Sequence, residues 1–244
     1  MDTLVGVDRD AGWRGGVDEI QVGGDGPISE QVTTPKPRLR GRFHQVALIV
    51  AVPASVRLVS AAPPGSVRTA MIIYAMSLIG LFGASTAYHR VTWSPAALRR
   101  VKSLDHSMIF LLIAGTYTAY GVLALHGLLR LLVLAVVWTG ALVGMTLKLV
   151  RIDQFSRAGG TLYIVLGWIG IVALPQVLSE SETPPLVLTV AGGVMYTVGA
   201  VVLLRNRPDP NPLVFGYHEI WHALVVGASA CHYTAITMLL HTEG

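Results

Sequence analysis

The most reactive grouping in this sequence is a pair of histidines, His218 and His222, separated by four positions. On an α-helix this spacing places both imidazoles on one face, one turn apart and about 40° around the axis. Two imidazoles in this position can bind one metal ion. His89, from a distant apolar run, would add a third neutral nitrogen, and a zinc ion with three protein ligands keeps its fourth position for water or substrate. The sequence therefore predicts a zinc site formed by His89, His218 and His222.

Two more polar residues are expected beside this site. Ser85 lies one helical turn before His89 on the same face, and Asp105 is expected to open the following helix. Either side chain could orient a ligand histidine or hydrogen-bond the bound water. Zinc lowers the pKa of such water to roughly 7, and Asp105 is the predicted catalytic residue, as its proton acceptor. The predicted chemistry is attack of hydroxide on a carbonyl carbon.

Residues 218 to 222 also match the His-Glu-x-x-His pattern of zinc proteases, in which Glu219 would be the base. This pattern is short and occurs often by chance, so an intramembrane protease is the less favoured alternative. Solvent, interface or packing roles are predicted for His44, His126, His232 and His241, and His106 is predicted to face a neighbouring helix or the headgroups rather than the metal. Cys231 is the single cysteine, which excludes a disulfide framework and a four-thiolate zinc site.

The elements that would position these residues are transmembrane helices. Of 244 residues, 52% are hydrophobic and 13% charged, against roughly 25% charged in a soluble domain. The apolar residues form runs long enough to cross the ~30 Å hydrocarbon layer. Seven spans are predicted, near 44–62, 68–89, 105–125, 128–150, 159–178, 184–204 and 218–240. The sequence thus predicts an all-α polytopic membrane protein with a seven-helix transmembrane domain over 43–240.

The orientation of this bundle follows from its basic residues, because Lys and Arg in short loops stay on the cytoplasmic side. With the N-terminus inside, thirteen would lie inside: Lys36, Arg38, Arg40, Arg42, Arg90, Arg99, Arg100, Lys102, Lys148, Arg151, Arg157, Arg205 and Arg207. Three would lie outside: Arg57, Arg68 and Arg130. This bias predicts a cell-membrane protein with a disordered, glycine-rich cytoplasmic tail over 1–42 and a short extracytoplasmic tail over 241–244. The predicted zinc site then lies near the cytoplasmic leaflet.

Three motifs in this order resemble a known family. They are Ser85-Thr86-Ala87-Tyr88-His89, then Leu104-Asp105-His106-Ser107 with Ile113-Ala114-Gly115-Thr116-Tyr117, and Tyr217-His218-Glu219-Ile220-Trp221-His222. Together they resemble bacterial hemolysin III proteins, which are related to the progestin and adipoQ receptors. The resemblance implies seven helices, a cytoplasmic N-terminus and zinc on His89, His218 and His222. Asp105 would lie beside the zinc-bound water, with Ser85 in the neighbouring shell.

The resemblance leaves the activity open. The wider superfamily includes alkaline ceramidases, which favours a zinc-dependent hydrolase acting on a lipid amide or ester from the inner leaflet. The animal receptors carry glutamine where Glu219 stands, which disfavours a protease-type base. A sensor or regulator of membrane state with structural zinc is the main alternative. A cytolysin ranks lower, because the apolar helices lack a long water-facing stripe.

The expected partners are membrane lipids. Nucleic acid is not expected as a partner, since the basic residues lie at span ends rather than in one stripe.

Overall fold

The computed structural model describes residues 37–150, 156–173, 176 and 183–242, without the side chains of residues 156–160. Within this described part the regular structure is helical, apart from an isolated bridge between Asn211 and Phe215. The elements are α1 (Arg42–Ala61), α2 (Ser66–Arg90), α3 (Pro95–Ala124), α4 (Gly127–Val150), α5 (Ser156–Trp168), the 3-10 helix η1 (Ile169–Ala173), α7 (Thr183–Arg205) and α8 (Tyr217–Thr242). The all-α prediction is confirmed for these residues.

Six of these helices are long and apolar enough to cross a membrane: α1, α2, α3, α4, α7 and α8. The predicted span over 159–178 corresponds to α5 and η1, which form a shorter apolar segment, and its last residues lie largely outside the described ranges. The count of seven spans therefore stays a prediction.

The first span contains Pro53 inside α1. The helix continues through it, because the loss of one backbone hydrogen bond does not end a helix that is packed against neighbours.

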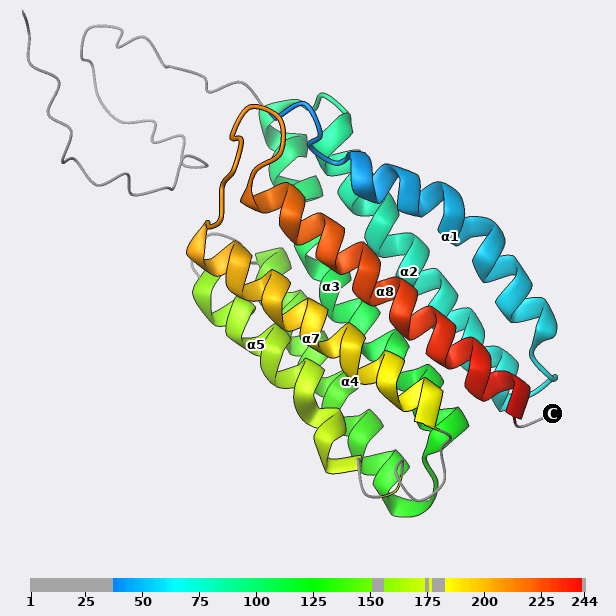
Figure 1. The fold of residues 1–244 in the computed structure, drawn as a ribbon. Coiled ribbons are helices and arrows are strands. Elements are labelled where there is room, and N and C mark those ends of the chain that lie inside the picture. The colour runs from blue at the N-terminus through cyan, green and yellow to red at the C-terminus, as the bar shows by residue number, and fades with distance from the viewer. Residues whose placement is uncertain (1–36, 151–155, 174–175, 177–182, 243–244) are drawn as a thin grey trace, which may run out of the picture. The chain divides into compact units, whose positions relative to one another are not determined.

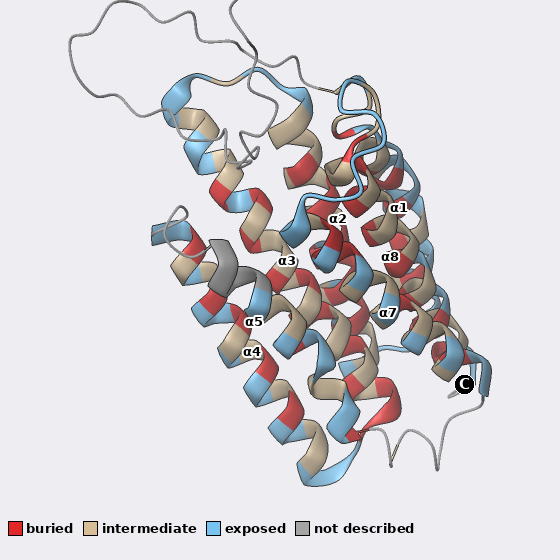
Figure 2. Ribbon diagram, turned by 60° about the vertical axis from the view of Figure 1, so that its left-hand side comes forward, coloured by how far each residue is buried: buried red, intermediate tan, exposed pale blue. Residues whose placement is uncertain are grey.

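Helices that follow one another in sequence pack together: α1 on α2, α2 on α3, α3 on α4, and α7 on α8 (Figure 1). Helix α8 also packs on α1, so the first and last spans are neighbours. Helix α3 contacts α5 and α8 in addition to α2 and α4, and residues buried within the bundle gather along it (Figure 2). Helix α3 is therefore the central element of the bundle.

The prediction that the third span begins near Asp105 is wrong, because α3 begins ten residues earlier, at Pro95. Ser94 caps this helix: its side chain accepts a hydrogen bond from the Ala97 amide at 3.4 Å. Proline is favoured in the first turn, where its missing N–H costs nothing. The hydropathy pattern missed this extension because Arg99, Arg100 and Lys102 make its first turns polar. Asp105 consequently lies inside the helix rather than at its start.

The outward faces of the helices are apolar. Large exposed hydrophobic side chains recur along α1, α4 and α7, among them Ile49, Val50, Leu131, Leu132, Val143 and Val190. Such faces would be costly in water but suit a hydrocarbon environment, where helices satisfy their own backbone groups.

One end of the bundle is defined by the starts of α1, α3 and α8 and the ends of α2 and α4, and is called here the histidine end. The Arg38 amide donates to the Leu213 carbonyl at 3.0 Å, which ties the segment before α1 to the segment before α8. The Ser103 hydroxyl donates to the Lys148 carbonyl and links α3 to the last turn of α4. These contacts fix the relative depth of the helix ends that carry the predicted site residues.

Candidate metal centre

Three histidines meet at the histidine end. His89 lies in the last turn of α2, and His218 and His222 occupy the first two turns of α8. One ring nitrogen from each of the three lies within 4.8 Å of the others. The ring centroids of His218 and His222 are 4.6 Å apart, and that of His89 lies 5.0 and 4.9 Å from them. The structure therefore brings together three imidazoles that are distant in the sequence, and they could hold a metal ion.

The spacing of two of the ring nitrogens matches the geometry of a zinc site. The Nε2 atoms of His89 and His218 are 3.3 Å apart. Two nitrogen ligands at the usual 2.0–2.1 Å from a tetrahedral zinc ion are about 3.3–3.4 Å apart. A single N–H···N hydrogen bond would also explain this one distance, but it would not explain the third imidazole. The donor set and spacing thus fit a three-histidine metal site.

Asp105 lies next to Ser85, which precedes His89 by one helical turn in α2. Asp105 is buried in α3, Ser85 is buried in α2, and the Ser85 hydroxyl interacts with the Asp105 carboxylate, though without the geometry of a formed hydrogen bond. Asp105 does not belong to the group of mutually close ligand atoms among the described residues. The Asp105 carboxylate is therefore not grouped with the three histidines as a ligand, and its catalytic role stays a prediction.

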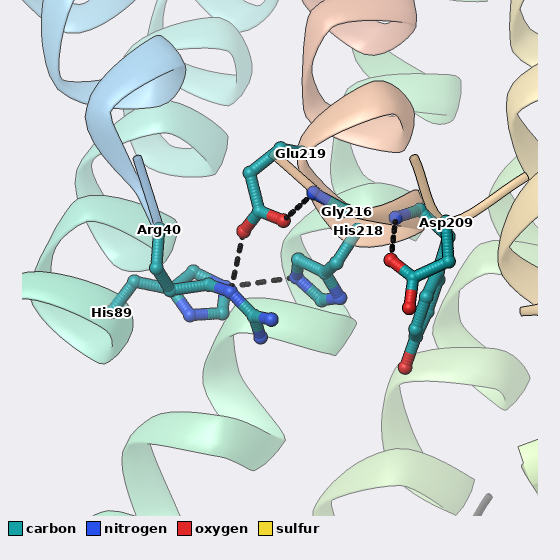
Figure 3. A network of polar contacts seen from close by, with 7 residues as sticks. Arg40, His89, Asp209, Gly216, His218 and Glu219 are labelled. Carbon is teal, nitrogen blue, oxygen red and sulfur yellow. Dashed lines mark hydrogen bonds and ion pairs between the residues drawn. The ribbon is translucent and has the colours of Figure 1, made fainter. Parts of the chain in front are cut away.

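Glu219 has structural partners for both carboxylate oxygens (Figure 3). Oε1 accepts from Nε of Arg40 at 2.6 Å, and Oε2 accepts from the Gly216 amide at 2.9 Å. The second bond joins a glutamate at the third helical position to the residue before the helix, as in a capping box. Only 1% of the Glu219 side chain is exposed. Its partners and burial indicate a role in fixing the start of α8, and hence the positions of the two histidines there.

The segment before α1 covers the site from the end of the bundle. Gly41 has φ +75° and lies so close to α2 that a Cβ atom on it would come within 2.6 Å of the His89 Cβ. Only glycine adopts this conformation readily, and only its missing side chain permits this approach. Arg40, immediately before it, forms the ion pair with Glu219. Residues 40 and 41 therefore contact the candidate site from the N-terminal side, which the sequence reasoning missed.

His44 packs against the site from the first turn of α1. Its ring lies face to face with that of His222, with centroids 3.9 Å apart and planes within 3°. Its side chain is buried, and Phe82 lies on it at a centroid distance of 5.2 Å. The prediction of a packing, interface or solvent role did not foresee this position. The signal available in the sequence was its place at the start of the first predicted span, at the same predicted depth as His89 and His218.

A second buried polar cluster lies farther along α8, around His232. Tyr120 Oη lies 3.1 Å from His232 Nδ1 and 2.8 Å from Thr189 Oγ1. The Tyr196 ring stacks on His232 at 5.7 Å, and its hydroxyl is hydrogen-bonded to Ser229 at 2.8 Å. This cluster, called here the His232 cluster, joins α3, α7 and α8, and it contains one imidazole. The predicted packing role of His232 agrees with these contacts.

Comparison with known proteins gives a consistent result. Residues 32–233 match the model of a family described as haemolysin-III related. The chain is 34% identical to Hemolysin-3 of Bacillus cereus over 190 residues, which cover 77% of this chain and 84% of that protein. It is 30% identical over 196 residues to the Hemolysin-3 homolog of Bacillus subtilis (strain 168), with 79% and 89% covered. The human monocyte to macrophage differentiation factor is 28% identical over 173 residues, 69% of each chain.

The family match and the six apolar helices agree with each other. They confirm the predicted multi-pass integral membrane protein and the resemblance drawn from the three motifs. The chain belongs to the haemolysin-III-related family.

Proposed function

We propose that this protein is a zinc-dependent membrane hydrolase that cleaves an amide or ester bond of a lipid. The observation that carries the proposal is the convergence of His89, His218 and His222 within 4.8 Å. Three imidazoles suit zinc and leave one coordination position for a reacting molecule. A site of this kind inside an apolar bundle is accessible to substrates that partition into the bilayer.

Each residue has a defined task in this proposal. Zinc held by His89, His218 and His222 would supply Lewis acidity and make hydroxide available near neutral pH. Asp105 would act as a general base and then a general acid, taking a proton from the attacking water and returning it to the leaving group. Ser85, beside Asp105, orients the carboxylate. Glu219 and Arg40 hold the first turn of α8 so that His218 and His222 face His89.

The proposed topology has seven spans, a cytoplasmic N-terminus and the site near the cytoplasmic leaflet. Its support is the location of basic residues at the histidine end, including Arg40, Arg90, Arg99 and Arg100, since positive charge concentrates on the cytoplasmic side. Single cysteines introduced at Arg99 and at His126, in a variant with Cys231 replaced, test it. A membrane-impermeant thiol reagent added to intact cells should label position 126 and leave position 99 unlabelled.

Cytolysis is a second candidate function, because two bacterial relatives are named for hemolysin activity. The described helices expose mainly apolar side chains, which makes a poor lining for a water-filled pore. Purified protein added to red cells should therefore cause no more lysis than its detergent buffer. The protease alternative is weaker, because the ion pair and the capping bond already engage Glu219.

The decisive experiment combines metal analysis with a substrate panel. Purified protein should contain about one zinc per chain and release fatty acid from at least one ceramide or acyl ester, and both should be lost on treatment with a chelator. Stoichiometric zinc with no turnover on a broad lipid panel contradicts the hydrolase and favours a sensor with structural zinc. Absence of bound metal contradicts both.

A further inference from the structure

His44 is a buried polar residue whose hydrogen-bonding capacity is unused by the described residues. Its side chain is 3% exposed, and neither Nδ1 nor Nε2 has a hydrogen-bond partner within the described ranges. In either protonation state an imidazole carries at least one N–H donor. Leaving such a donor unpaired inside a protein costs about 1–3 kcal/mol, whereas a phenyl ring would fill the same space without this cost. The imidazole therefore serves a purpose other than packing.

The geometry of His44 excludes one simple purpose, that of a fourth metal ligand. An imidazole nitrogen binds a metal along its lone pair, in the plane of the ring. The rings of His44 and His222 are parallel within 3° and stacked at 3.9 Å, so their ring planes do not converge on one ion. His44 is accordingly absent from the group of mutually close ligand atoms, which contains His89, His218 and His222.

A second buried polar group lies near the same histidines. Ser85 Oγ, one turn before His89, is buried and lies by the Asp105 carboxylate without the geometry of a formed hydrogen bond. Ser85 comes from α2 and His44 from α1, and both helices border the three-histidine site. The two His44 nitrogens, left unpaired beside a metal-type site, indicate that a polar molecule completes their hydrogen bonds.

We propose that His44 binds the substrate, by donating a hydrogen bond from its ring to the carbonyl oxygen of the lipid amide or ester. The inference rests on the proposed function and specifies a substrate contact on the α1 side of its site. The stack places the His44 ring 3.9 Å from a ligand ring, close enough to reach a molecule bound beside His222. A carbonyl oxygen is the acceptor that an N–H donor in this position matches, and an amide and an ester both have one.

Cobalt-substituted protein in detergent tests this inference, with octanohydroxamic acid as the probe. This compound carries a carbonyl oxygen and a metal-binding group on a short acyl chain that partitions into micelles. Its binding is followed through the visible absorption of cobalt, which requires no turnover. The variant is His44→Phe, which keeps a flat ring on His222 and removes both nitrogens.

The matched control is Ser55→Ala, which removes another buried, unpaired polar atom from the same helix, eleven residues farther along. We expect His44→Phe to bind cobalt with wild-type stoichiometry and the hydroxamate about tenfold more weakly, which corresponds to about 1.4 kcal/mol. Ser55→Ala should match the wild type in both measurements. If His44→Phe is not monodisperse, His44→Leu makes the same removal without the ring.

The possible results separate the two proposals. Wild-type hydroxamate affinity in a cobalt-loaded His44→Phe variant overturns the inference, and so does loss of cobalt from that variant, since His44 would then act on the metal. Cobalt-loaded wild-type protein that does not bind the hydroxamate also overturns it, but leaves the metal centre intact. Wild-type protein that binds neither cobalt nor zinc overturns the proposed function together with the inference.

Discussion

Helix α8 carries two buried histidine clusters that lie ten residues, or about 15 Å, apart and differ in how their ring nitrogens are used. At the histidine end, rings from α1, α2 and α8 crowd together: His44, His89, His218 and His222. In the His232 cluster a single imidazole is hydrogen-bonded to Tyr120 and stacked on Tyr196. His44 and His222 are buried at the histidine end, and His232 and Ser229 are buried in the His232 cluster.

This difference shows that a buried histidine in a membrane helix does not by itself mark a functional site. His232 has an ordinary hydrogen-bond partner, and its contacts join three helices. At the histidine end, by contrast, the rings converge on one another, and the nitrogens of the adjacent His44 have no hydrogen-bond partner among the described residues. Convergence together with an unpaired imidazole is the signature of a site that binds a ligand.

The largest expected difference between the two clusters is in bound zinc after one imidazole ring is removed from each. His89→Ala and His222→Ala should each reduce bound zinc from about one per chain to a trace, because two imidazoles hold zinc far more weakly than three. His232→Ala should keep its zinc and lose only thermal stability. Elemental analysis of the three purified proteins measures this contrast. Equal zinc in all of them would show that the two clusters do not differ in metal binding.

Replacement of the nearby carboxylate comes next. Asp105→Asn should keep zinc and lower turnover on a responsive lipid by about 10²–10⁴-fold, which is the usual contribution of a general acid–base group. The matched change is Ser229→Ala in the His232 cluster, which should leave turnover within a factor of about two to three. Initial rates at saturating lipid give the comparison. Unchanged turnover in Asp105→Asn would assign the proton transfer to another group.

The histidine end contains an ion pair between Arg40 and Glu219, whereas the His232 cluster is joined by hydrogen bonds of hydroxyl groups and one imidazole. Arg40→Ala leaves the Glu219 carboxylate, which is 1% exposed, without its cation. Breaking such a pair from one side costs about 3 kcal/mol, at the low end of the usual range because Arg40 is 25% exposed. Thermal unfolding in detergent measures the loss, with the exposed Arg38→Ala as control. A melting temperature equal to that of the control would mean that this pair does not stabilise the start of α8.

The smallest expected effect comes from a pair of glycine substitutions, one at each cluster. A Cβ atom at Gly41 would meet the His89 Cβ at 2.6 Å, and one at Gly192 would meet the His232 ring at 2.6 Å. Each alanine variant should lose about 1–3 kcal/mol of stability through overpacking. Gly41→Ala should also weaken zinc binding, measured by competition with a chelator, since it displaces a ligand. Gly192→Ala should leave zinc affinity unchanged, and weakened binding there would show that the two clusters are coupled.

Some features of this protein follow from its sequence alone. Long apolar runs require helices that cross a hydrocarbon layer, because unpaired backbone groups are too costly there, and this predicted the all-helical bundle correctly. The spacing of His218 and His222 places both on one helical face irrespective of the rest of the fold. Polar sequence at a helix start carries a weaker signal, so the extension of α3 back to Pro95 was missed although Ser94 and Pro95 are typical of a helix start.

Other features were decided only by the tertiary structure. The packing of α8 against α1 as well as α2 and α3 brings His44 onto His222 and Arg40 onto Glu219, which are 178 and 179 positions apart in sequence. No local pattern encodes these contacts, because they depend on which helices are neighbours and how they are rotated. The close approach of Gly41 to His89 has the same origin. The sequence determines which residues each helix presents, whereas the packing of the helices determines which of those residues meet.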